Sequence, residues 1–123
     1  MEVASERQEA KKKARVAVLI SGGGTNLQAI IDGVESSALP HVEIALVVSN
    51  KATAYGLKRA QAAGIPSAVI ASPTYSTKAS QEAALLQILR AQNIDLVALA
   101  GFLSILSADF IAHCPAPIVN IHP

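Results

Sequence analysis

The sequence is poor in aromatic residues and almost free of cysteine. Its 123 residues include two tyrosines, two phenylalanines, no tryptophan and one cysteine, and its net charge is +1. With few rings for bases to stack on and no long-range field, we expect no nucleic acid and no membrane as a partner. The lone Cys114 cannot form an internal disulfide, so we expect a reducing, cytoplasmic location.

Long hydrophobic runs are missing as well. The longest uncharged apolar stretch lies between Asp95 and Asp109, and it is shorter than the roughly 18 residues of a membrane-spanning helix. Three lysines precede the apolar run 16–20, but that run ends at a glycine-rich segment. A signal peptide needs an apolar region of roughly 7–15 residues, so we predict a strand here instead.

Composition divides the chain into a short arm and one folded part. Residues 1–13 are rich in charge and carry almost nothing apolar, so we predict a flexible polar arm there. Hydrophobic residues make up 51% of the whole chain, which suffices for one buried core. The remaining residues, 14–123, have the length of a single domain.

Beyond the arm, strand-like and helix-like patterns alternate. They predict five strands and four helices, with strands at 15–20, 42–48, 67–70, 95–100 and 118–121 and helices at 25–36, 53–63, 77–92 and 107–113. Apolar strands between helices indicate an α/β fold with a parallel sheet covered on both faces. We predict a doubly wound, Rossmann-like sheet in strand order 3-2-1-4-5, whose ligands bind beyond the carboxyl ends of the strands.

Three consecutive glycines, Gly22 to Gly24, follow the first predicted strand. Glycines let the backbone approach a ligand closely, and the helix start offers unpaired N–H groups for a phosphate. We expect Thr25 or Asn26 to cap the helix and to donate to the phosphate oxygens. Leu27 replaces the third glycine of a dinucleotide-binding motif, so a small phosphorylated metabolite is favoured over NAD. The alternative is a tight turn without a ligand.

The last predicted strand ends in an amide and an imidazole. Asn120 and His122 are two residues apart, so they share one face of a strand and can converge on one reacting atom. An asparagine can donate to a developing oxyanion, and a histidine can move a proton near neutral pH. We predict that both are catalytic, whereas His41, His113 and Cys114 are structural. The scattered histidines and the single cysteine form no metal-ligand set, so we expect no metal.

These motifs together resemble the phosphoribosylglycinamide formyltransferase family. The similar blocks are 15–31 with its glycine loop, 49–51 (Ser-Asn-Lys), 99–106 and 120–123 (Asn-Ile-His-Pro), in the family's order and spacing. The resemblance implies the transfer of a formyl group from the co-substrate 10-formyltetrahydrofolate to the amine of 5-phosphoribosylglycinamide in de novo purine synthesis. It also implies that 14–123 is the amino-terminal, acceptor-binding part of a formyltransferase domain.

The resemblance assigns a role to each matching position. It implies that Gly24, Thr25 and Asn26 hold the ribose phosphate of the acceptor. It places Asn120 and protonated His122 on the oxyanion of the reaction. The residues that it implies for folate binding are Lys78, Leu103, Ser104, Ile105, Leu106 and Asn120.

The sequence departs from the family pattern at three places. Lys78 and Ser104 stand where the family commonly has arginines, and a lysine lacks the two-pronged guanidinium. The chain also stops at Pro123, before the family's catalytic aspartate and its remaining strands. We therefore expect a sheet truncated after its fifth strand, with an open cleft and a histidine that lacks the carboxylate expected to raise its pKa.

Two further interpretations of the sequence are open. Within folate chemistry, the chain could be a formyltetrahydrofolate hydrolase or another folate-dependent formyltransferase; an assay that needs no phosphoribosyl acceptor would favour the hydrolase. Outside enzymology, it could be a phosphosugar-binding remnant without catalysis. An exposed sheet edge also leaves a homodimer open.

The first prediction concerns the isolated 123-residue chain. Because the cleft is open to water and the histidine lacks its carboxylate, we expect the chain alone to be inactive or poorly active. A formyl-transfer assay with the purified chain checks this, and robust turnover by the chain alone would contradict it.

Overall fold

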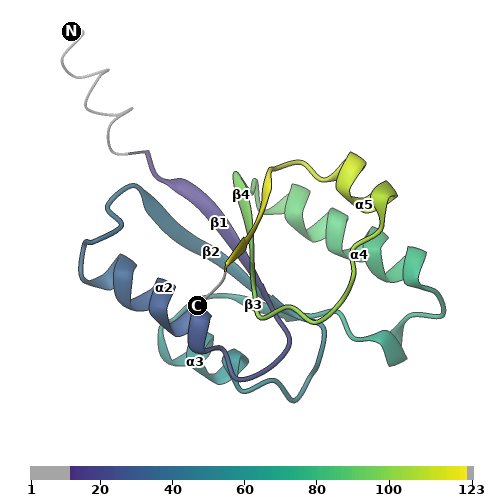
Figure 1. The fold of residues 1–123 in the computed structure, drawn as a ribbon, viewed down its shortest axis with the longest axis horizontal. Helices are drawn as coiled ribbons and strands as arrows, with labels where there is room; N and C mark the ends of the chain where they lie inside the picture. Colours follow the sequence, from purple (N-terminus) through teal and green to yellow (C-terminus); the bar gives the residue numbers. More distant parts are fainter. Residues whose placement is uncertain (1–11, 122–123) are drawn as a thin grey trace, which may run out of the picture.

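A computed structural model describes residues 12–121 of the chain (Figure 1). Five strands form the sheet: β1 (Ala14–Ile20), β2 (Val42–Ser49), β3 (Ser67–Val69), β4 (Leu96–Ala100) and β5 (Ile118–Ile121). The helices are α2 (Thr25–Glu35), α3 (Gly56–Ala62), α4 (Lys78–Ala91) and α5 (Ala108–His113), with a short 3-10 turn, η1 (Ser72–Thr74), before α4. Of the predicted arm, residues 1–11 lie outside the described residues, and Lys12 and Lys13 are exposed and belong to no helix or strand.

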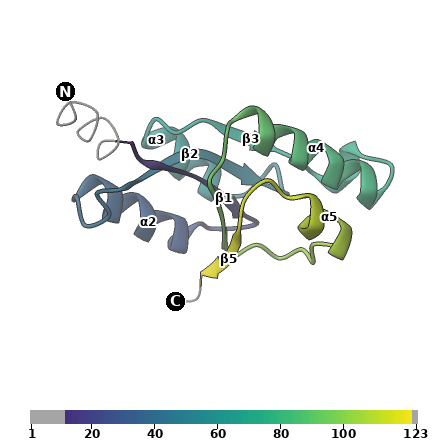
Figure 2. The ribbon, with the colours of Figure 1, turned by 90° about the horizontal axis from the view of Figure 1, so that it is seen from above.

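The five strands are parallel and lie in the order β3-β2-β1-β4-β5, which confirms the predicted fold class and strand order. β1 is central and pairs with both β2 and β4. Its register with β2 shifts between Val16 and Ala17, where Ala45 is the additional residue of β2. Figure 2 shows β5 at one edge of the sheet, away from β3.

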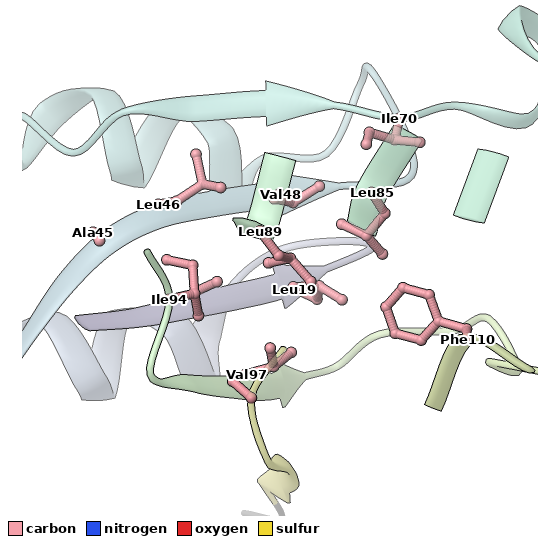
Figure 3. Close-up of a cluster of buried hydrophobic side chains, with 12 residues drawn as sticks. Leu19, Ala45, Leu46, Val48, Ile70, Leu85, Leu89, Ile94, Val97 and Phe110 are labelled. Carbon is pink, nitrogen blue, oxygen red and sulfur yellow. The ribbon is translucent and has the colours of Figure 1, made fainter. Parts of the chain in front are cut away.

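Helices cover both faces of the sheet. Figure 1 shows α2 and α3 together on one side and α4 and α5 on the other. Alternate residues of β1 divide between two cores: Val16, Val18 and Ile20 face α2 and α3, whereas Ala17 and Leu19 face α4 and α5. This is the pattern of a strand buried on both faces. Figure 3 shows the second core, in which Leu89 and Phe110 pack against the sheet.

Two features differ from the sequence prediction by more than one residue at an element end. The second predicted helix, expected from residue 53, is α3 and begins at Gly56, because Ala54 and Gly56 donate backbone hydrogen bonds outside the helix, to Lys51 and Gly22. η1 was not expected, since a single 3-10 turn has no periodicity to detect. α3 ends before Gly64 and Pro66, as predicted. Gly64 comes directly after the C-cap Ala63 and has a left-handed φ of +72°. Within residues 12–121 no helix is long and apolar enough to cross a membrane.

The aliphatic core predicts a clear difference between two leucines. Leu89 is fully buried, whereas the Leu103 side chain is 77% exposed. We expect Leu89→Ala to lower the free energy of unfolding by about 2–5 kcal/mol, because it removes packed methyl groups and leaves a cavity. Leu103→Ala, the matched control, is expected to change it by less than about 0.5 kcal/mol. Urea denaturation measures both, and equal effects would contradict this description of the core.

Candidate functional site

The glycine loop connects the carboxyl end of β1 to α2. Gly24 adopts the left-handed conformation (φ +79°, ψ +28°) and is the N-cap of α2, with no side-chain capping bond. Its carbonyl accepts from the N–H of Gln28 at 2.8 Å, the first hydrogen bond of the helix. The prediction that Thr25 or Asn26 caps the helix is therefore wrong: both already lie in its first turn, beyond the position from which a side chain can cap.

The loop lies directly against the start of α3. A Cβ atom on Gly24 would be 2.7 Å from the Cα of Gly56, and a Cβ on Gly56 would collide with the Ile20 side chain. The two segments are joined by a hydrogen bond of 3.0 Å from the Gly56 N–H to the Gly22 carbonyl. Both glycines are needed because the backbones cross without room for a side chain. The sequence analysis missed Gly56; a glycine opening a helix was the available signal.

Backbone N–H groups at the start of α2 remain free for a ligand. Because the helix bonds begin at Gln28, those of Thr25, Asn26 and Leu27 have no partner within the helix. The amino end of a helix also carries a partial positive charge. The loop and this first turn can therefore accept an anion, and the predicted residues Gly24, Thr25 and Asn26 lie together there.

A second loop, residues 101–107, follows β4 at the same edge of the sheet. Gly101 starts it with a left-handed φ of +70°. The N–H of Leu103 donates to the hydroxyl of Ser21 at 2.7 Å, and Ser21 is only 2% exposed. This bond ties the second loop to the glycine loop, and Ser21 is a residue that the sequence analysis did not single out.

Helix α4 holds the other end of this second loop. Lys78 donates to the Ser104 hydroxyl at 3.3 Å and also to the carbonyl of Ile105. One turn later, the Glu82 carboxylate accepts from the N–H of Ser107 at 2.9 Å and from its hydroxyl at 2.5 Å. Ser107 in turn caps α5 by accepting from the N–H of Phe110. Glu82, four residues after Lys78 on the same helix face, was also missed.

The structure brings some of the predicted folate residues together and separates others. Lys78, Ser104 and Leu106 line one pocket between β2, α4 and the second loop. Leu103 and Ile105 do not line it, and their side chains are 77% and 85% exposed. The Asn50 side chain also lines the pocket, and its buried Oδ1 has no hydrogen-bond partner among the described residues.

The predicted catalytic pair is only partly described. Asn120 is exposed on β5 and is the register partner of Leu99 on β4. His122 lies outside the described residues, so its convergence with Asn120 stays a prediction. Within residues 12–121 no group of three His, Cys, Asp or Glu side chains could hold a metal ion. His113 instead contacts the carboxylate and carbonyl of Asp109 on its own helix.

Comparison with known sequences identifies a family. The pattern of the formyl transferase family matches residues 14–123. The phosphoribosylglycinamide formyltransferase of Haemophilus influenzae is 46% identical over 109 residues, covering 89% of this chain and 51% of the relative. The trifunctional purine biosynthetic protein adenosine-3 of Bos taurus is 49% identical over 113 residues, which are 91% of this chain and 11% of the relative.

Solved structures agree with this similarity. The phosphoribosylglycinamide formyltransferase of Brucella melitensis superposes with a TM-score of 0.85 at 41% identity, covering 91% of this chain and 58% of that one. The glycinamide ribonucleotide transformylase 1 of Symbiobacterium toebii gives a TM-score of 0.83, also at 41% identity, with 90% and 52% covered. The chain thus spans about half the length of these single-function relatives.

Two glycines of the loop provide a matched pair of substitutions. We expect Gly24→Ala to lower the free energy of unfolding by about 2–4 kcal/mol, because a left-handed alanine costs about 1–2 kcal/mol and its Cβ would also meet the Gly56 backbone. A Cβ on Gly23 meets nothing within 4 Å, so Gly23→Ala is expected to change stability by less than about 0.5 kcal/mol. Denaturant unfolding of both variants checks this, and a Gly24→Ala variant as stable as Gly23→Ala would contradict it.

Proposed function

The chain belongs to the formyl transferase family, and on this premise we propose that it is the acceptor-binding part of a phosphoribosylglycinamide formyltransferase. In this proposal a formyl group passes from 10-formyltetrahydrofolate to the amine of 5-phosphoribosylglycinamide during purine synthesis. The observation that carries the proposal is the glycine loop: its unpaired N–H groups lie at a helix start, and Ser21 bonds it to the second loop.

The loop is suited to the phosphate of the acceptor. Gly24, Thr25 and Asn26 present backbone N–H groups at the positive end of α2, and neither Thr25 nor Asn26 spends its side chain on a cap. Both side chains are thus free to donate to phosphate oxygens. The crossing with Gly56 fixes the loop before a ligand arrives, which reduces the entropy lost on binding.

The donor is proposed to lie along the second loop. Leu103 and Ile105 expose apolar side chains there, and such surface suits a flat aromatic ring system. Lys78 donates hydrogen bonds to Ser104 and Ile105 of this loop, and its ammonium is suited to a carboxylate of the donor. Ser104 and Leu106 share a pocket with Lys78, so the predicted folate residues divide between the pocket and the exposed surface.

Formyl transfer requires one bond to form and one to break. The acceptor amine attacks the formyl carbon to give a tetrahedral oxyanion, and the bond from that carbon to the folate nitrogen then breaks. We assign to Asn120 a hydrogen bond that stabilises the oxyanion. His122 is proposed to assist at the oxyanion and to move the proton lost by the amine to the departing folate nitrogen.

Other expectations from the sequence remain proposals. The partners are the two small molecules, with no nucleic acid and no membrane, and the location is the cytoplasm. A homodimer would use an open sheet edge; β5 pairs with β4 alone among the described strands, and Val119 on it is partly exposed.

A chimera tests the proposed function. Residues 1–123 are fused to the portion of the Haemophilus influenzae relative that the chain does not span, and formyl transfer is measured with phosphoribosylglycinamide and with the same acceptor lacking its phosphate. We expect turnover of the phosphorylated acceptor and a greatly raised KM without the phosphate. Donor consumption without any acceptor would instead indicate a hydrolase, and no turnover of either acceptor would contradict the proposal.

The same chimera tests Asn120. Because this amide is proposed to stabilise the oxyanion, we expect Asn120→Ala to lower kcat by about 10²–10³-fold with little change in the KM of the acceptor. Val119→Ala, one position earlier on β5, is the control and should stay within about threefold of the parent. An Asn120→Ala variant as active as this control would remove Asn120 from the mechanism.

A further inference from the structure

We propose that Arg59 is a positioning residue that sets the orientation of the phosphate-binding loop. This inference rests on the proposed function, because it concerns how the loop presents its N–H groups to the acceptor phosphate. Arg59 lies on α3, outside the glycine loop. No motif in the sequence marked it.

Arg59 contacts the glycine loop directly. Its Nε donates to the carbonyl of Gly23 at 2.7 Å, and its Nη1 donates to the side-chain oxygen of Gln28 on α2 at 3.3 Å. The guanidinium also lies over the Tyr55 ring, 5.1 Å from its centre. Arg59 is half-buried, so these contacts define one position for the guanidinium between α2 and α3.

With the hydrogen bond from Arg59 to Gly23, three consecutive carbonyls of the loop accept hydrogen bonds. The carbonyl of Gly22 accepts from Gly56, that of Gly23 accepts from Arg59, and that of Gly24 accepts from the N–H of Gln28. Three consecutive carbonyls of the loop are therefore fixed by donors from α3, from the Arg59 side chain and from α2.

Because the peptide unit is planar, the direction of each hydrogen-bonded carbonyl sets the direction of the N–H of the next residue. In a trans peptide the C=O of one residue and the N–H of the next point in opposite directions. Fixing the carbonyls of Gly22 and Gly23 towards α3 therefore aims the N–H groups of Gly23 and Gly24 away from it. Since the Gly24 carbonyl points along α2, the N–H of Thr25 points out of the helix start. Without Arg59 the carbonyl of the Gly23–Gly24 peptide would lose this hydrogen bond, whereas the carbonyls of Gly22 and Gly24 would keep theirs.

Three substitutions separate this donor role from a simple charge effect. Arg59→Met removes both the donor and the charge. Arg59→Gln removes the charge but keeps an amide N–H at the same distance along the side chain as Nε. Lys58→Met removes the same charge from the neighbouring residue. The Nζ of Lys58 also lies over the Tyr55 ring, 5.8 Å from its centre, but among the described residues Lys58 makes no side-chain hydrogen bond to the loop.

The experiment measures the affinity of the 123-residue chain for inorganic phosphate. Phosphate is titrated into each protein while the amide NMR signals of residues 23–26 are followed, and thermal unfolding confirms that every variant is folded. We expect Arg59→Met to weaken phosphate binding at least about tenfold, Arg59→Gln no more than about threefold, and Lys58→Met less than about twofold.

Each result either supports or contradicts the positioning role of Arg59. Arg59→Met binding as tightly as the wild type would overturn the inference and leave the proposed function intact. Equal weakening in all three variants would assign the effect to charge and would also overturn it. If Arg59→Met does not fold, an Arg59→Gln variant at least tenfold weaker than Lys58→Met would still contradict the inference. If the wild type shows no saturable shift at residues 23–26, the phosphate site of the proposed function fails as well.

Discussion

The site depends on one steric constraint, the crossing of two backbones at Gly24 and Gly56. There is no room between them for a Cβ atom, and the Gly56 N–H bonds to the Gly22 carbonyl across the crossing. This contact sets where α2 starts, because Gly24 must be left-handed, and where α3 starts, because Gly56 is its first residue. It also brings Arg59, less than one turn along α3, into reach of the loop.

A second contact joins the two halves of the site. Ser21 follows the central strand β1 and is almost completely buried, and its hydroxyl accepts from the N–H of Leu103 in the loop after β4. β1 and β4 are the neighbours at which the strand order reverses, and ligands of such sheets bind there. A shift of the glycine loop, proposed for the acceptor, would therefore be transmitted to the second loop, proposed for the donor, through one hydrogen bond of 2.7 Å.

The strands and their order could be predicted from the sequence because their evidence is local. A buried parallel strand is a run of apolar residues such as 16–20, and the handedness of crossovers leaves few orders to choose from. The start of α2 at Thr25 was predicted, but its N-cap and the start of α3 were not, because both depend on the Gly24–Gly56 crossing between segments 32 positions apart. Local sequence predicted that Thr25 or Asn26 caps α2. The N-cap is Gly24 instead, because its left-handed backbone is required by the contact with Gly56.

The site shows the same division between local features that the sequence indicates and tertiary contacts that it does not. Gly24, Lys78 and Ser104 could be proposed as site residues from motif and resemblance, and those roles stay predictions. Ser21, Glu82 and Arg59 form hydrogen bonds to distant backbone atoms, and no sequence spacing indicates such contacts. Asn120 lies on β5, and its pairing with His122 stays a prediction.

The central claim is that the glycine loop holds the phosphate of the acceptor, and a crystal structure of the chain with phosphoribosylglycinamide tests it most directly. The account predicts phosphate oxygens at hydrogen-bond distance, about 2.7–3.2 Å, from the backbone nitrogens of Gly24 and Thr25. A phosphate bound instead at Lys78 and Ser104, with the glycine loop empty, would contradict it.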